Sequence, residues 1–342
     1  MKVLLVAGGD LPIPPPAWGG IENVIWQQTI ALREAGHTVH ILNKKRKRTL
    51  NALRAMPWRY DVVHLHLDAL SEVWVPLARR FRFPLVISTH YGYAAFPDKW
   101  SDYYRTIAGH MAPADYMLVL SHEMKQTLLN QGFRGTIYVL PNGIDCDKVR
   151  CAPTASKQAI VLGRVEVRKQ QALMTTALDG HTVQVDFVGP MGEDADGFAP
   201  NGRNTHYLGQ WSRDQVHQDL TQYACLVLLS DGEGHAGVVS EALAAGLSLV
   251  LSPEASHNLD LSREWIHIVD RDRDNMGDVI ARAAWENGQY RQQIRRYCEE
   301  NFDWKLILPQ YTQILEQVAS RKGATLRPPT VPDGEPNAPS HR

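Results

Sequence analysis

The stretch CLVLLSDGEGHAGVVSEALAAGLSLVLS, residues 225–252, predicts a complete strand–loop–helix–strand unit. Cys225–Leu229 is a short apolar run typical of a buried strand, and Ser248–Ser252 is a second one. Between them, residues 238–245 favour a helix that Gly246 ends, because glycine accepts the left-handed conformation at a helix C-terminus. This is a βαβ unit, and ligands on such sheets bind at the carboxyl ends of the strands.

Two carboxylates flank the loop-to-helix junction of this unit. Glu233 lies in the loop and Glu241 lies early in the expected helix. An isolated pair of glutamates at this spacing is more often one loop side chain and one solvated helix side chain. Their position changes the interpretation, because unpaired N–H groups at a helix N-terminus attract anions and polar oxygens. The junction is therefore a candidate ligand site.

Alternation of strands and helices extends outward from this unit in both directions. Strands are expected in the first half at 3–7, 38–42, 61–67, 85–88, 116–120 and 138–140, and in the second half at 159–162, 183–188, 206–209, 225–229, 248–252 and 267–269. Helices are expected near 21–35, 274–287 and 289–301 among others. A polar segment with Pro153 separates the halves. The pattern predicts an α/β protein with two doubly wound, Rossmann-like domains, 1–153 and 154–304, facing each other across a cleft.

Bulk composition excludes several classes of protein. The chain has 342 residues, 44% hydrophobic content and a net charge of −1, which fits two globular domains without a polyelectrolyte partner. No apolar run approaches the ~20 residues that span a bilayer, and the N-terminal run at 3–7 is too short for a signal peptide. The spacing of the four cysteines is typical of neither a disulfide framework nor a metal site, so we expect them to be free thiols in a reducing cytoplasm. The Pro-rich segment 323–342 is expected to be disordered.

Positive charge is concentrated in the first half of the chain. Residues 1–150 hold 18 Lys and Arg against 12 Asp and Glu, and the remainder holds 18 against 25. Much of the excess lies in Lys44–Arg59, where basic side chains alternate with Leu50, Leu53 and Trp58. Most such runs are solvated faces. The sharper interpretation is contact with an anionic membrane surface, whereas nucleic acid is not expected because no binding motif accompanies the run.

Other polar residues fall at the functional edges of the expected sheets. Gly19-Gly20 opens a helix after the first strand, where a tight turn and a phosphate-binding backbone are equally good interpretations. His90 follows a strand, and Arg164 and Lys169 follow the first strand of the second domain, where two cations could hold a diphosphate. Arg168 between them is expected to be solvated. His64 and His66 share one strand face, but a metal is not expected there without a third ligand.

Eight pieces of sequence in order resemble a known family. They are WGGIENVIWQQTIALREAGHTVHIL, DVVHLHLD, STHYG, ADYMLVLS, PNGID, GRVEVRK, YLGQWS and EGHAGVVSEALAAG, spread over residues 1 to 318. The set is similar to retaining glycosyltransferases of the GT-B fold, family 4, and the last piece meets the family's E-x7-E pattern with Glu233 and Glu241. The resemblance implies that a C-terminal helix, about 305–320, packs back on the first domain. It also implies transfer of a sugar from a nucleotide-sugar donor to an acceptor hydroxyl with retention.

The resemblance implies a role for each matched residue. Gly19 and Gly20 would contact the donor diphosphate, and His90 would lie beside the sugar. Arg164 and Lys169 would neutralise the departing diphosphate, which is why no cofactor or metal is expected. Glu233 would contact the transferred sugar and Glu241 the ribose. Asp145 and Asp147 form a D-x-D, but within PNGIDCD this pattern is interpreted as structural.

The chain departs from the family pattern inside its central motif. His235, Ala236 and Gly237 replace the usual aromatic, glycine and aliphatic residues, and Ser240 replaces an aliphatic one. His235, Ala236, Gly237 and Val238 are expected to line the donor site. The departure is therefore expected to change which sugar is bound and not the class of reaction.

Several functional alternatives remain at this point. The leading interpretation is a cytoplasmic transferase, peripheral at the inner face of the membrane, that uses a UDP- or GDP-linked sugar and a glycan or lipid-linked acceptor in bacterial surface-glycan or lipopolysaccharide synthesis. A nucleotide-sugar epimerase and a non-catalytic nucleotide-sugar-binding protein share the expected fold. A Rossmann dehydrogenase is disfavoured because the first turn lacks G-x-G-x-x-G.

Overall fold

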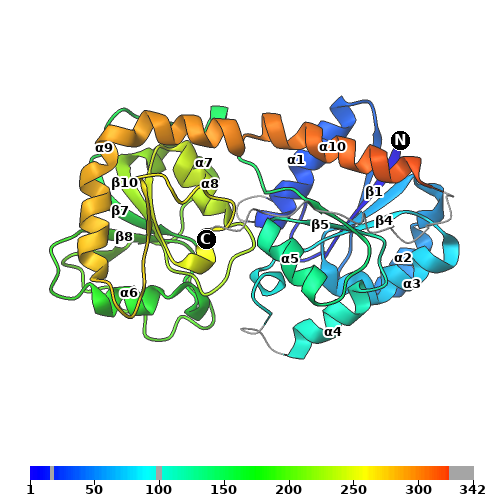
Figure 1. Cartoon of the computed structure of the whole chain (residues 1–342), viewed down its shortest axis with the longest axis horizontal. Coiled ribbons are helices and arrows are strands. Elements are labelled where there is room, and N and C mark those ends of the chain that lie inside the picture. Colours follow the sequence, from blue (N-terminus) through cyan, green and yellow to red (C-terminus); the bar gives the residue numbers. More distant parts are fainter. Residues whose placement is uncertain (16–18, 98–101, 323–342) are drawn as a thin grey trace, which may run out of the picture.

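The computed structural model describes residues 1–15, 19–97 and 102–322, which form two α/β domains (Figure 1). Each domain contains one six-stranded sheet, and every pair of neighbouring strands is parallel. The expected doubly wound architecture is therefore confirmed. The segment 323–342, predicted to be disordered, lies outside the described residues.

The N-terminal sheet has the strand order β2-β1-β3-β4-β5-β6. Its strands are β1 (Lys2–Ala7), β2 (Thr38–Asn43), β3 (Val62–Leu65), β4 (Leu85–Ser88), β5 (Tyr116–Val119) and β6 (Thr136–Val139). Its helices are α1 (Gly20–Glu34), α2 (Arg48–Arg54), α3 (Ser71–Phe81), α4 (Asp102–Met111) and α5 (His122–Asn130), with short 3-10 turns at η1 (Pro57–Arg59), η2 (Asp68–Leu70) and η3 (Gly92–Ala94). The inner strands β3, β4 and β5 are buried along their whole length because helices cover both sides of the sheet, whereas the edge strand β2 is partly exposed.

The C-terminal sheet has the strand order β12-β11-β10-β7-β8-β9. Its strands are β7 (Lys157–Leu162), β8 (Val185–Val188), β9 (Thr205–Tyr207), β10 (Tyr223–Leu228), β11 (Ser248–Leu251) and β12 (Ile266–Ile268). Its helices are α6 (Gln171–Ala177), α7 (Arg213–Asp219), α8 (Gly237–Ala244) and α9 (Met276–Asn301), with 3-10 turns at η6 (Val167–Lys169), η7 (Leu220–Gln222) and η8 (Pro253–Ala255). The unit β10–α8–β11 is the βαβ unit predicted from residues 225–252.

Helix α9 corrects the expectation of two helices at 274–287 and 289–301. It runs without a break through Gly288. Asn287 and Arg291, one turn apart, are both buried and are bonded to each other at 2.7 Å. Arg291 also donates to the carbonyl oxygen of Thr221 at 2.7 Å. These buried hydrogen bonds outweigh the roughly 1 kcal/mol by which glycine disfavours a helix interior.

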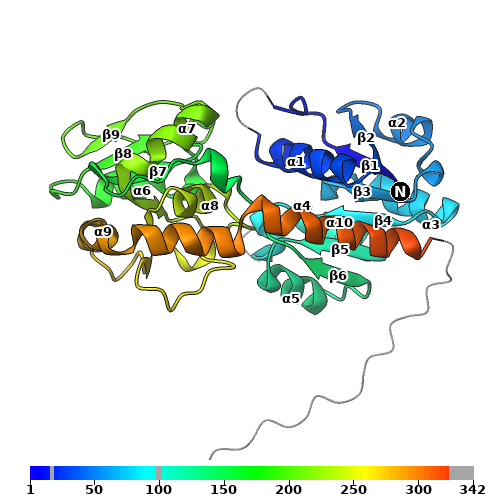
Figure 2. The ribbon, with the colours of Figure 1, turned by 90° about the horizontal axis from the view of Figure 1, so that it is seen from above.

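The last helix, α10 (Trp304–Ser320), returns to the N-terminal domain. It lies alongside α1 on one face of the N-terminal sheet, as Figure 2 shows. The two segments that cross between the domains are bonded to each other: the N–H of Ile144 donates to the carbonyl oxygen of Phe302 at 2.8 Å, and the N–H of Trp304 donates to that of Ile144 at 2.9 Å. The chain therefore crosses between the domains as a paired double connection.

Candidate functional site

A pocket of about 240 Å³ lies between the two domains. Helices and loops of both domains line it: Gly20, Ile21, Asn23, Val24, Gln27, His90, Asn142, Gly143 and Ile144 from the N-terminal side, and Lys169, Arg213, Glu233, His235, Ala236, Gly237, Val238, Glu241 and Trp304 from the remainder. Most of the site residues predicted from the sequence are thus brought together. Gly19 and Arg164 do not appear among the lining residues.

Two helix N-termini from different domains reach this pocket. Gly20 is the first residue of α1, and Gly237 is the first residue of α8; both line the pocket. The first turns of both helices have backbone N–H groups without partners inside the helix, and their dipoles favour negative charge. Lys169 and Arg213 add two cations to the same lining. The arrangement is therefore suited to an anionic ligand such as a diphosphate.

Glu241 lies in the second turn of α8 and faces the pocket. Burial raises the pKa of its carboxyl group to about 7, and the nearby charges of Arg213 and Lys169 act in the opposite direction. A carboxyl group in this state can accept and donate hydrogen bonds to sugar hydroxyls. This is compatible with the predicted contact to a ribose.

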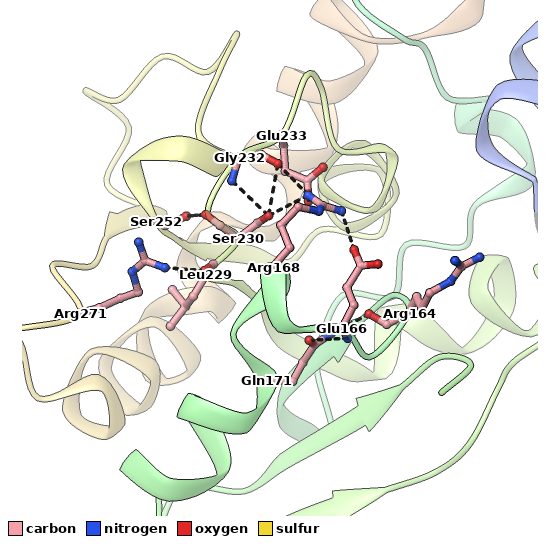
Figure 3. Close-up of polar contacts among 10 residues, drawn as sticks. All are labelled: Arg164, Glu166, Arg168, Gln171, Leu229, Ser230, Gly232, Glu233, Ser252 and Arg271. Carbon is pink, nitrogen blue, oxygen red and sulfur yellow. Dashed lines mark hydrogen bonds and ion pairs between the residues drawn. The ribbon is translucent and has the colours of Figure 1, made fainter. Parts of the chain in front are cut away.

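Glu233 is held by Arg168, which corrects the expectation that Arg168 is solvated. Nη1 of Arg168 donates to Oε1 of Glu233 at 2.8 Å and to the carbonyl oxygen of Gly232 at 2.6 Å, while Nη2 donates to Glu166 at 2.6 Å (Figure 3). The Arg168 side chain is only 27% exposed. The two carboxylates outweigh the effect of burial and raise the pKa of the guanidinium above its ordinary value. One arginine thus sets the position of Glu233.

Arg164 is exposed and points away from this cluster in Figure 3. Its backbone carbonyl accepts a bond from Gln171, but its guanidinium is not brought to the pocket. Arg213, which sequence reasoning missed, occupies the pocket instead. A signal existed: Arg213 directly follows YLGQWS, one of the pieces that resemble the family, and Ser212 forms a capping box at the start of α7.

His90 lies after β4 on the N-terminal side of the pocket. Its Nε2 lies 3.3 Å from Nδ1 of His66, and burial lowers the pKa of His90 to about 4, so the ring is neutral at neutral pH. His64 lies against His66 with ring centroids 3.9 Å apart and the rings tilted by 45°, and it is bonded to Tyr311 and Ser88. The H-x-H pair therefore belongs to a buried network behind His90.

The D-x-D residues lie away from the pocket lining. Asp145 pairs with Lys148 at 2.7 Å, and Asp147 pairs with Lys305 at 2.7 Å. Within 1–15, 19–97 and 102–322, no group of three or more His, Cys, Asp or Glu side chains has the arrangement of a metal site.

Asn142, Gly143 and Trp304 line the pocket but were not predicted, because the loop and the last helix meet there only after the chain has crossed twice between domains.

Comparisons with known proteins agree with this geometry. Residues 44–148 match the family model of Glycosyltransferase Family 4. Sucrose-phosphate synthase from Thermosynechococcus elongatus is 16% identical with a TM-score of 0.75, covering 93% of this chain and 99% of that chain. Anabaena HepE in complex with UDP and glucose is 16% identical with a TM-score of 0.69, covering 93% of this chain and all of that chain (100%). A trehalose-6-phosphate synthase is 14% identical with a TM-score of 0.72, covering 93% and 99%. Curated proteins give no match.

Residues 44–148 carry a Glycosyltransferase Family 4 domain, and the two domains together have the GT-B fold of the solved glycosyltransferases to which the chain is similar. The matched residues 44–148 cover most of the N-terminal domain, and the fold likeness extends over both domains. The resemblance seen in the sequence is therefore confirmed at the level of fold and enzyme class. In the described part of the chain, no helix combines the length and apolar character needed to cross a bilayer.

Proposed function

We propose that this glycosyltransferase moves a sugar from a nucleoside-diphosphate donor to an acceptor hydroxyl with retention of configuration. The observation that carries the proposal is the convergence of two helix N-termini, two cations and two glutamates on one pocket between the domains. Such a pocket can hold a diphosphate between the domains, with a nucleoside on one side and a sugar on the other.

The proposed mechanism follows from the charges at the site. As the bond between the sugar and the diphosphate breaks, negative charge grows on the departing phosphate, and Lys169, Arg213 and the N-terminus of α1, which line the pocket, would stabilise it. The sugar becomes oxocarbenium-like, and the carboxylate of Glu233 stabilises that charge. Glu241 holds the ribose hydroxyls, and neutral His90 lies beside the sugar. Since Arg164 is exposed and does not line the pocket, we assign the role predicted for it to Arg213.

Uridine is the nucleoside that we propose first, ahead of guanosine. The solved structures of Anabaena HepE contain UDP or UDP-glucose, and another similar structure holds UDP-2-fluoro glucose. Those ligands were bound by the other proteins. Because this chain shares their fold, we propose to test uridine donors before others.

The decisive experiment is a thermal-shift panel of UDP-, GDP-, ADP- and CMP-sugars, followed by a transfer assay with the donor that binds. A specific donor raises the melting temperature by mass action. Product analysis with donor alone tests the epimerase alternative, because an epimerase releases a changed nucleotide sugar without an acceptor. Absence of any stabilising nucleotide sugar would contradict the proposal, and an inverted anomeric configuration in the product would contradict retention.

We also propose that turnover does not depend on a metal ion, because Lys169 and Arg213 supply the positive charge that a divalent cation supplies in other transferases. Initial rates measured with and without EDTA are expected to agree. Loss of turnover on chelation, restored by Mn²⁺, would show that the two cations are insufficient.

The acceptor is proposed to be a bacterial surface-glycan or lipopolysaccharide intermediate at the cytoplasmic face of the membrane. Support comes from the basic face at Lys44–Arg59, where α2 and η1 expose Leu50, Leu53 and Trp58. Trp58 and Phe81 lie with ring centroids 4.6 Å apart and are both partly exposed. Aromatic and basic side chains on one surface suit a lipid headgroup region.

A further inference from the structure

Two of the positions where the central motif departs from the family pattern, 235 and 240, are hydrogen-bond partners. Nε2 of His235 lies 3.0 Å from Oγ of Ser240, one turn into α8. The other ring nitrogen, Nδ1, lies 3.0 Å from Nδ2 of Asn258. His235 and Ser240 are buried, and the ring also lies 5.2 Å from that of Phe302. The imidazole is therefore held from three directions.

The amide of Asn258 has a single orientation that satisfies its partners. Its Nδ2 also lies 2.8 Å from the main-chain carbonyl oxygen of Leu120, which can only accept a hydrogen bond. The group that faces Leu120 must therefore be the NH₂, and its second hydrogen is directed to Nδ1 of His235. Nδ1 then accepts, so the proton of the neutral ring is on Nε2 and is donated to Ser240. Neither ring nitrogen is left to bind a sugar.

This amide joins the two domains. Asn258 follows η8 in the C-terminal domain, whereas Leu120 follows β5 in the N-terminal domain. The adjacent residue, His257, stacks on Phe96 across the same boundary with ring centroids 5.1 Å apart. A Cβ added at Gly92 would lie 2.5 Å from the carbonyl oxygen of Gly232, so the backbones of the two domains touch there. Because its two partners belong to different domains, separation of the domains would break the hydrogen bond to Leu120.

We propose that Asn258 and His235 are positioning residues that couple closure of the two domains to the shape of the donor pocket. The expected change in turnover rests on the proposed function, whereas the expected change in the distance between the domains does not. When the domains meet, Asn258 binds the carbonyl of Leu120 and directs its second hydrogen to His235, which fixes the ring at the N-terminal end of α8. His235 then presents ring carbons to the donor, so its part in sugar selection is steric. This differs from a direct polar contact between His235 and the sugar.

The test is Asn258→Gly. Asn258 has a φ of 66°, a left-handed conformation that glycine adopts without strain, so the substitution removes the amide and leaves the backbone intact. Distances between spin labels on the two domains, with and without donor, report closure. Asn258→Gly is expected to shift the distribution toward the open form and to lower turnover about tenfold, as loss of two partly buried hydrogen bonds implies. Arg82→Gly, at a left-handed position on the exposed surface of the N-terminal domain, is the control and is expected to match the wild type.

Ser240→Ala tests the shape of the donor pocket separately from closure of the domains. It removes the partner of Nε2 but keeps the bridge from Asn258 to Leu120, so the closed distance distribution is expected to persist while the preference among donor sugars changes. An Asn258→Gly protein with the wild-type distance distribution in both states would overturn the coupling. If the wild type binds no nucleotide sugar while Asn258→Gly still opens the cleft, the proposed function fails and the interdomain contact stands.

Discussion

At the scale of single residues, the site depends on charged groups that are held by other charged groups. Arg168 contacts Glu233, Glu166, Ser230 and the carbonyl of Gly232 with one guanidinium. Only a planar group with several donors can make these contacts at once, and a lysine ammonium cannot. Because Glu233 is the proposed partner of the reacting sugar, the position of Arg168 decides where that carboxylate lies.

Replacing Arg168 by lysine is therefore expected to lower kcat while the protein stays folded. Loss of a charge-assisted hydrogen bond to Glu233 corresponds to about 1.5–3 kcal/mol, or roughly 10- to 100-fold in rate. Steady-state kinetics with the preferred donor measure the effect. Arg203→Lys, an exposed arginine in the same domain, is the control. Wild-type kcat in Arg168→Lys would mean that Glu233 needs no such support.

Glu241 predicts a pH dependence of stability. Burial raises the pKa of its carboxyl group from 4.5 to about 7, so the folded state binds the proton more tightly than the unfolded state. Its contribution to the free energy of unfolding is fully present below about pH 4.5 and is lost as pH rises through 7. Glu241→Gln removes this loss.

Urea unfolding at pH 5 and pH 8 measures the effect. Between these two pH values, the free energy of unfolding of Glu241→Gln is expected to gain on the order of 2 kcal/mol relative to the wild type, after allowance for the partial exposure of Glu241. Glu300→Gln, on an exposed part of α9, is expected to leave the difference between the two pH values unchanged. Equal behaviour of the two variants would contradict the raised pKa.

At the scale of elements, α10 completes a domain that begins more than 300 residues earlier in the chain. Its buried residues Ile307, Tyr311, Leu315 and Val318 recur at helical spacing and pack in the same core as β1 and α1. The hydroxyl of Tyr311 also lies 2.8 Å from Nδ1 of His64, whose ring in turn lies against that of His66 behind His90. The last helix thus supports both the N-terminal core and one wall of the site.

Leu315→Ala is expected to destabilise the protein by about 2–5 kcal/mol, because it opens a cavity under a fully buried side chain. Leu306→Ala, on the same helix at 42% exposure, is expected to change the free energy of unfolding by less than about 0.5 kcal/mol. Chemical denaturation followed by circular dichroism gives both values. Similar effects of the two substitutions would show that α10 is not anchored to the N-terminal core.

At the scale of the whole molecule, the two domains meet at the pocket and the basic face lies elsewhere. The helices α2 and α3 are at the end of the N-terminal domain that is remote from the C-terminal domain (Figure 1). Within this face Lys45 pairs with Asp10 and Arg48 lies 3.8 Å from Glu72, which leaves a net positive surface. A membrane bound there would not contact the C-terminal domain.

The protein is accordingly expected to bind anionic vesicles and to lose that binding as salt screens the charges. Charge reversal at Lys44, Arg46 and Arg54, all exposed, is expected to abolish the interaction, whereas Arg273→Glu in the other domain is expected to retain it. Vesicle flotation with phosphatidylserine or phosphatidylcholine measures the difference. Equal binding to the two lipids would remove the support for a membrane-bound acceptor.

Local patterns in the amino-acid sequence were enough to predict the fold class and most of the residues that line the pocket. These features follow from local patterns: apolar strands of fixed period, glycines at helix ends, and polar residues directly after strands, as at Glu233 and His90. Which charges meet depends on the tertiary structure. Arg164 and Arg168 are four residues apart in the segment that follows β7, yet Arg168 is bonded to Glu233 while Arg164 is exposed and directed elsewhere. Likewise, the contacts of Asn258 with His235 and Leu120 join segments 23 and 138 residues apart, a distance that no local pattern encodes.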